Sequence, residues 1–139
     1  MKLMLALLAM GLAGWGGLQD AQQPAVDKAS GDAKTADTSK LANPVKSTPD
    51  SIAAGKKSYG LDCAMCHGKD GSGNGDLATD MKLKLKDYRD PAVLKDMTDG
   101  EMYGVILNGK GQMTGEEGRL NATQIWNVVN YIRSLSKKS

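Results

Sequence analysis

The residues best suited to chemistry lie in one short segment, Asp62-Cys-Ala-Met-Cys-His-Gly68, which holds both cysteines and the only histidine of the chain. Thiols and an imidazole at this spacing can bind zinc, cycle between dithiol and disulfide, or form covalent bonds to another molecule. A structural zinc site needs four protein ligands, and the chain has no further Cys or His. A redox-active CxxC expects a βαβ setting, whereas the pattern around Cys63 is helical. A structural disulfide across two residues closes too small a loop to stabilise the protein much.

Covalent attachment of a haem accounts for all three residues, because CxxCH is the known pattern for it. The sulfurs of Cys63 and Cys66 can form thioethers to the two vinyl groups of one haem, and His67 can bind the iron from one face. A haem would also fill a core short of large side chains, since the chain has two Trp, four Tyr and no Phe. The sequence therefore favours one haem c, with zinc, a redox dithiol and a disulfide as weaker alternatives.

The N-terminal part of the chain predicts export followed by a tether. Residues 1–21 carry Lys2 followed by an apolar run, which is typical of an export signal, and the apolar run is shorter than the ~20 residues that span a bilayer. In the alternative, residues 1–18 are not cleaved and associate the protein with a membrane. Residues 22–50 are rich in Ala, Pro, Ser, Thr, Lys and Asp and predict a flexible linker. Export would place the domain of residues 51–139 in the periplasm or at the outer face of the cytoplasmic membrane.

Residues 51–139 carry helical signals at four places. We expect a first helix running into Cys63 and capped by Asp50 or Ser51, and a short helix near Pro91. The capping box Thr98–Glu101 predicts a third helix, which Asn108-Gly109 ends.

A second capping box, Asn121–Gln124, predicts a last helix. Its apolar stripe recurs at spacings of three and four residues: Ile125, Val128, Val129, Ile132 and Leu135. Only Met81–Lys86 alternates like a strand. One short strand makes no sheet by itself, so the domain should be helical.

With these features, residues from Ser51 to about Leu135 resemble the class I c-type cytochromes. The likeness rests on Gly55, Tyr59, Cys63–Gly68, Asp99–Gly109, Met113 and Trp126–Ile132. It implies an all-α fold, the small cytochrome c fold, with three to five helices wrapped around one covalently attached haem. It also implies that the first and last helices cross where Gly55 meets the ring of Tyr131, since a glycine permits close approach.

The resemblance implies a methionine as the second iron ligand, opposite His67. Met65 is confined between the two cysteines, and Met97 and Met102 flank a capping box, where core packing is expected. Met81 is a second choice. Met113 lies in a glycine-rich loop that matches the family's ligand loop, so we expect Met113 and His67 to bind the iron.

Two departures from the family pattern concern the loops around the expected ligands. Thr114 follows Met113 where the family commonly has a proline, which predicts a softer loop. The turn 71–77 also lacks the family's proline beside the carbonyl that accepts the Nδ1 hydrogen of His67. We expect this nitrogen to donate to a carbonyl, because ligating histidines generally do.

The charged and aromatic residues outside this site give weaker signals. The basic run Lys82, Lys84, Lys86 and Arg89, with Tyr88, suggests a solvated face or a rim for an acidic redox partner. Tyr103 and Trp126 are expected in the core or against the haem rather than at an electron exit. The net charge of +2, from 18 basic and 16 acidic residues, gives no reason to expect nucleic acid binding.

The sequence therefore predicts an exported monohaem electron carrier without catalytic residues. It would accept one electron from a redox protein and pass it to another in a respiratory or photosynthetic-type chain, including a membrane respiratory complex. The alternative is a haem enzyme or gas sensor with an open sixth position on the iron. A third hypothesis makes the domain a fixed subunit of a respiratory assembly.

Overall fold

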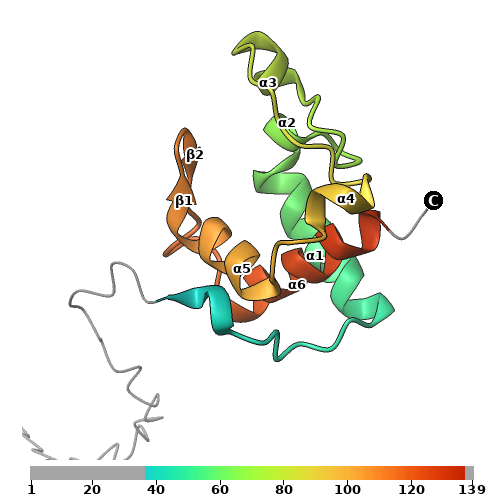
Figure 1. Ribbon diagram of the computed structural model, residues 1–139, viewed down its shortest axis with the longest axis vertical. Coiled ribbons are helices and arrows are strands. Elements are labelled where there is room, and N and C mark those ends of the chain that lie inside the picture. The colour runs from blue at the N-terminus through green and yellow to red at the C-terminus, as the bar shows by residue number, and fades with distance from the viewer. Residues whose placement is uncertain (1–36, 137–139) are drawn as a thin grey trace, which may run out of the picture. The chain divides into compact units, whose positions relative to one another are not determined.

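The computed structural model describes residues 37–136; the predicted export signal and residues 22–36 of the predicted linker lie outside them. The elements in chain order are η1 (Thr38–Lys40), α1 (Pro49–Asp62), α2 (Ala64–His67), α3 (Asp76–Asp80), α4 (Pro91–Leu94), α5 (Asp99–Asn108), β1 (Gly109–Lys110), β2 (Met113–Thr114) and α6 (Ala122–Leu135) (Figure 1). The expected all-α class is confirmed, although the described residues form six α-helices and not the three to five expected. The two strands have two residues each and form a hairpin in which Lys110 pairs with Met113.

Helix α1 begins two or three residues earlier than the sequence indicated. Its N-cap is Thr48, so the expectation of Asp50 or Ser51 was wrong. The Thr48 hydroxyl accepts from the Ser51 amide at 3.2 Å, and the Ser51 hydroxyl accepts from the Thr48 amide at 3.1 Å. Pro49 occupies the first helical position, where its fixed φ and missing N–H cost nothing.

The other predicted helix starts are confirmed. The Glu101 backbone amide donates to the Thr98 hydroxyl at 3.1 Å, and the Gln124 backbone amide donates to the Asn121 side-chain oxygen Oδ1 at 3.0 Å. In return, the Glu101 and Gln124 side chains accept from the backbone amides of Thr98 and Asn121. Asp90 caps α4 ahead of Pro91. Local capping chemistry thus sets three of the helices that surround the site.

The crossing of α1 and α6 forms the densest part of the fold. A Cβ atom at Gly55 would lie 1.9 Å from the Asn127 carbonyl oxygen and 3.0 Å from the Tyr131 Cβ. The predicted close approach is therefore confirmed, but its tightest contact is backbone against backbone rather than glycine against the ring. The Tyr131 ring instead meets Tyr59 edge-on, with ring centroids 5.0 Å apart.

The apolar stripe predicted for α6 is buried along its whole length. Ile125, Val128 and Val129 are 0 % exposed, and Leu135 at the end of the stripe is 7 % exposed. The stripe packs in one cluster with Tyr59, Leu94, Met102, Ile106, Trp126 and Tyr131. Helices α1, α5 and α6 thus share a single core, against which the remaining elements are placed.

Residues 37–48, which the sequence assigned to the linker, pack against α5 and α6. Helix α5 accommodates them at its glycines, since a Cβ at Gly100 would lie 2.0 Å from the Thr38 carbonyl oxygen. The buried Asn130 of α6 accepts from the Asn43 side chain at 2.9 Å and donates to the Val45 carbonyl at 3.1 Å. The packed part of the chain therefore extends upstream of Ser51.

Residues 81–86 alternate as predicted but form no strand. Leu83 and Leu85 are half-buried, and the lysines between them are exposed. The segment lies against the backbone at Gly73, where a Cβ would come within 2.9 Å of the Leu85 and Lys86 carbonyl oxygens. The alternation thus separates an inward face from an outward one without strand pairing.

Candidate functional site

The CxxCH segment sits where α1 ends. Cys63 is the last residue bonded to α1, with its amide donating to the Tyr59 carbonyl at 2.9 Å, and the short α2 then carries Cys66 and His67. Neither cysteine forms a disulfide; Cys63 is buried and Cys66 is half-buried. Burial first, and then the nearby carboxylate of Glu116, raises the pKa of the Cys63 thiol to about 12. One helical segment therefore presents both sulfurs and the imidazole.

The glycine-rich turn after His67 locks α2 in place. The Gly73 amide donates to the His67 carbonyl at 2.8 Å, and the Gly75 amide donates to the Cys66 carbonyl at 3.0 Å. Gly75 lies so close that a Cβ there would stand 2.2 Å from the Met65 carbonyl oxygen. The Tyr59 hydroxyl adds a bond of 3.0 Å to the Gly68 carbonyl. These contacts fix the backbone of the motif to the core.

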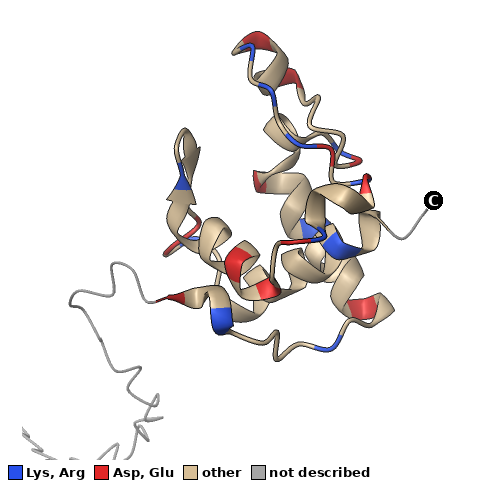
Figure 2. Ribbon diagram, viewed as in Figure 1, with Lys and Arg blue, Asp and Glu red and all other residues tan. Residues whose placement is uncertain are grey.

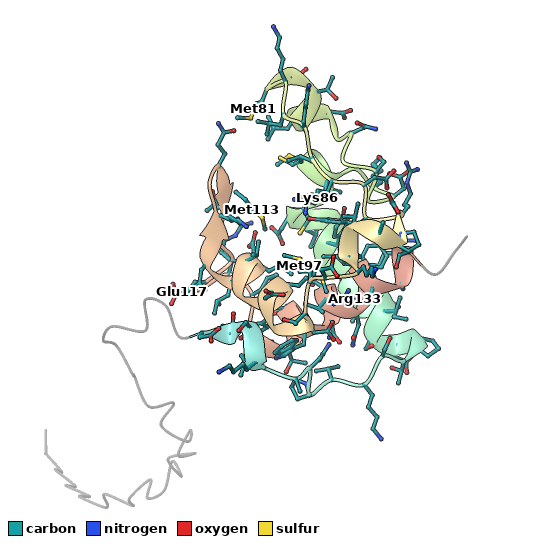
Figure 3. The ribbon with its side chains drawn as sticks, viewed as in Figure 1. Met81, Lys86, Met97, Met113, Glu117 and Arg133 are labelled. Atoms are coloured by element: carbon teal, nitrogen blue, oxygen red, sulfur yellow. The ribbon has the colours of Figure 1, made fainter. Side chains whose placement is uncertain are left out.

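A cleft of about 670 Å³ opens in front of this motif. Its volume falls within the ~300–1,000 Å³ of cofactor and ligand pockets. The walls include Cys63, Cys66, His67, Leu77, Met81, Leu83, Leu85, Tyr88, Val93, Leu94, Met97, Val105 and Met113. Figure 3 shows Met113 on the hairpin, Met97 beside α5 and Met81 beside α3. A smaller cavity shares Cys63, His67 and Met113 with it and reaches the core residues Met102 and Ile106.

The Tyr88 ring packs against a face of the His67 ring. The two rings stack with centroids 5.2 Å apart and planes 20° apart. Burial lowers the pKa of His67, which favours the neutral imidazole that can bind a metal. Its Nδ1 is buried and has no hydrogen-bond partner among the described residues, so the expected bond to a carbonyl is not found.

The five methionines considered as ligands occupy different environments. Met65 is 61 % exposed and Met102 is 4 % exposed within the core, which agrees with setting both aside. Met97 was expected in the core, but its side chain also lines the cleft. Met81 lines the cleft while 51 % exposed, and Met113 lines it half-buried. The geometry thus brings Met81, Met97 and Met113 to the cavity that holds His67.

Three charged residues of the cleft wall were missed by the sequence reasoning. Arg119 forms ion pairs with Asp62 and with Glu116, whose side chain is only 7 % exposed. Asp62 and Glu116 are far apart in the chain, so no local spacing could indicate that they share a partner. A glutamate so completely buried is the unusual feature, and only the fold reveals it.

The basic run is more neutral than its sequence implied. Arg89 pairs with Asp70 and with Asp87, each at 2.7 Å, while Lys82 and Lys84 stay exposed. Figure 2 shows both basic and acidic positions on the ribbon between α3 and α4. Tyr103 and Trp126 stack on each other with centroids 4.2 Å apart, and neither lines the cleft. Of the two roles expected for this aromatic pair, core packing is therefore the one observed.

Comparison with known proteins assigns this architecture to a family. The family model "Cytochrome c" matches residues 52–136, so the chain belongs to the cytochrome c family. Solved structures include a c-type cytochrome, KustC0563, at 23% identity and a TM-score of 0.52, covering 58% of this chain and 95% of that one.

A second solved structure is the Kuenenia stuttgartiensis reducing HAO-like protein complex Kustc0457/Kustc0458. It matches at 24% identity and a TM-score of 0.55, over 68% of this chain and about half (49%) of that one. At these identities both structures support the shared fold. No curated protein matches this chain.

The protein is accordingly a c-type cytochrome, a haem protein that transfers electrons between redox partners. The family binds haem c covalently through a CxxC pair, here Cys63 and Cys66. The residues present fit that group, since both sulfurs, a half-buried imidazole and apolar walls line one cleft of suitable size. Cytochrome c domains are typically extracytoplasmic. Within residues 37–136, none of the helices has the length and hydrophobicity needed to cross a bilayer.

Proposed function

We propose that this chain binds one haem c, with His67 and Met113 as iron ligands, and carries single electrons between two redox proteins outside the cytoplasm. The observation that carries the proposal is the cleft, whose walls unite Cys63, Cys66, His67 and Met113. The iron, when bound, supplies the one-electron chemistry. The protein supplies the ligands, the orientation and the surroundings that set the potential.

Each of these residues has a distinct task. Cys63 and Cys66 fix the macrocycle, and the turn after His67 holds the imidazole-bearing backbone still. The walls supplied by Leu83 and Leu85 limit the access of water, which favours the less charged, reduced state of the iron. A thioether ligand acts in the same direction, because it raises the potential relative to a second histidine.

Met113 is the proposed ligand among the three methionines of the cleft. Met81 is half exposed, so much of its side chain faces water. Met97 and Met113 both pack against the core cluster, and both line the cleft and the smaller cavity beside His67. Met113 is favoured by its place on the hairpin that the backbone of β1 supports, within the glycine-rich loop that matches the family's ligand loop. An occupied sixth position supports a carrier rather than a haem enzyme or gas sensor.

The biological setting belongs to the same proposal. The lysine and apolar run within residues 1–21 support export to the periplasm or to the outer face of the cytoplasmic membrane. A respiratory or photosynthetic-type chain supplies donors and acceptors in that compartment. We propose a freely diffusing carrier, with a fixed subunit of a respiratory assembly as the outcome if the protein co-purifies with a membrane complex.

The test compares optical spectra of the exported, haem-loaded protein with those of Met113→Ala, Met97→Ala and Met81→Ala. We expect a reduced spectrum of c type, one haem per chain by mass, and a weak far-red band in the oxidised protein that only Met113→Ala abolishes. Ferrous Met113→Ala should also bind carbon monoxide readily, and the other proteins should not. Loss of the band in Met97→Ala or Met81→Ala would identify that methionine as the iron ligand in place of Met113. A high-spin spectrum that none of the variants changes would favour the enzyme or sensor.

A further inference from the structure

A cluster of three charged residues, Asp62, Glu116 and Arg119, joins the chain after Met113 to the helix that carries Cys63. Arg119 Nη2 donates to Asp62 Oδ1, across a separation of 57 residues. Arg119 Nε lies 3.5 Å from Glu116 Oε2. One guanidinium therefore bridges the end of α1 and the segment that leaves β2. Asp62 immediately precedes the first cysteine of the motif.

The two carboxylates of this cluster depend on Arg119. The Asp62 side chain is 14 % exposed and the Glu116 side chain is 7 % exposed, while Arg119 is 60 % exposed. Glu116 Oε2 has no hydrogen-bond partner among the described residues, so the nearby guanidinium is its compensation. Buried carboxylates are costly without a counter-charge. Removing Arg119 would leave both carboxylates in one wall of the cleft without their cation.

The other contacts of this segment lead to a different helix. Lys110 pairs with Met113 in the hairpin, and the Glu116 amide donates to the Ile106 carbonyl of α5 at 2.9 Å. These bonds tie Met113 to α5, not to the helix that enters the haem-binding motif. Since Thr114 and not proline follows Met113, no ring fixes φ at that position. The link to α1 is made by Arg119.

We propose that Arg119 is a positioning residue that holds residues 113–119, the Met113 segment, against the Cys63 end of α1 and so keeps Met113 on the haem iron. This inference rests on the proposed function, because it requires Met113 as the ligand. Arg119 touches neither the iron nor Met113 in this role. It acts through two carboxylates: Asp62 at the end of α1 and Glu116 in the chain that follows β2.

The test measures how easily imidazole displaces Met113 from the oxidised, haem-loaded protein, followed by loss of the far-red band. Arg119→Gln should lower the half-displacing imidazole concentration about tenfold, because opening the segment then relieves two uncompensated carboxylates. Arg119→Lys keeps a cation there and should restore most of the difference. Asp62→Asn keeps an acceptor oxygen and should have a smaller effect in the same direction.

The matched control is Arg89→Gln. Arg89 also pairs with two carboxylates, but they belong to Asp70 and Asp87, and none of the three residues lines the cleft. Its removal should leave the imidazole titration unchanged. Asp62→Asn also serves as the reporter if Arg119→Gln does not fold.

The outcomes separate this inference from the proposed ligation. The positioning role alone is overturned if the far-red band depends on Met113 but Arg119→Gln leaves the imidazole displacement unchanged. If Arg119→Gln does not fold, the same result in Asp62→Asn overturns it. An equal change in Arg89→Gln overturns it as well, because the effect would then come from lost surface charge. Absence of any Met113-dependent band in the unmodified protein overturns the ligation and this inference together.

Discussion

The crossing of α1 and α6 and the cleft in front of His67 differ in how completely their side chains are packed. At the crossing, Ile125, Val128 and Val129 are 0 % exposed, and Gly55 brings two backbones into contact. Along the cleft, apolar side chains such as Leu83 and Leu85 are only half-buried. The crossing completes its packing with protein atoms, whereas the cleft presents apolar walls suited to a large flat cofactor.

This difference indicates a division of labour within a small domain. The crossing should supply most of the stability that the polypeptide itself provides, because stability follows apolar burial and packing. The cleft should govern ligation and potential, through side chains that the crossing holds in place. Substitutions at the two regions should therefore separate loss of folding from loss of haem properties.

The largest effect on folding is expected at Gly55. Gly55→Ala places a Cβ 1.9 Å from the Asn127 carbonyl oxygen, so the two helices must separate. We expect the free energy of unfolding to fall by about 3 kcal/mol, since overpacked cores commonly lose that much. Urea unfolding of the haem-loaded protein measures the loss.

The control for Gly55→Ala is Gly60→Ala on the same helix. Its added Cβ has no atom within 4 Å, and removing a helical glycine should stabilise the protein by about 0.5–1 kcal/mol. Equal effects of the two substitutions would mean that the close approach at Gly55 does not limit stability.

An intermediate effect is expected at Asn130, where residues 37–48 meet the crossing. Asn130 is 4 % exposed, and its side chain bonds to Asn43, to the Val45 carbonyl and to Ser51. Asn130→Ala leaves several of these groups unsatisfied and should cost about 2 kcal/mol. Asn43→Ala removes one of the bonds from a less buried position and should cost less. Thermal unfolding should rank the two in this order, and the reverse order would contradict a structural role for Asn130.

The parts of this fold that were predictable from sequence depend on short-range rules. The boxes at Thr98 and Asn121 were found because the bonds that form them join residues three apart. The stripe of α6 follows from helical periodicity alone. CxxCH is equally local, and it led to the cofactor and the family. The assignment of Met113 as the ligand remains a prediction.

The features that the sequence did not reveal depend on distant partners. Residues 37–48 look like a linker because they are polar, yet Gly100 and Gly104 of α5 leave room for Thr38 to lie against that helix. Arg119 looks like an ordinary surface residue until its pairing with Asp62 is known. Met97 was assigned to the core from its place beside a capping box, and only the fold shows that its side chain also reaches the cleft.

The smallest effect is expected outside the crossing, at the exposed ion pairs of Arg89 in the segment 70–89. Hydrogen bonds from Arg89 to Asp87 lower the pKa of that carboxyl to about 2. Because the pKa is depressed in the folded state, the pair stabilises the protein above the unfolded value of ~3.9 and loses this contribution as the pH falls toward 2. Exposed pairs contribute little, so Arg89→Gln should leave unfolding near neutral pH almost unchanged.

In Arg89→Gln the titration midpoint of Asp87, followed by NMR, should rise toward ~3.9. A shifted midpoint with unchanged unfolding would support the crossing as the main source of stability, since a well-formed contact outside it would then contribute almost no folding free energy. A large drop in the urea midpoint of Arg89→Gln at neutral pH would contradict this role of the crossing. The segment 70–89 would then support the fold through the contacts of Arg89 with Asp70 and Asp87, and the crossing could not be the main source of stability.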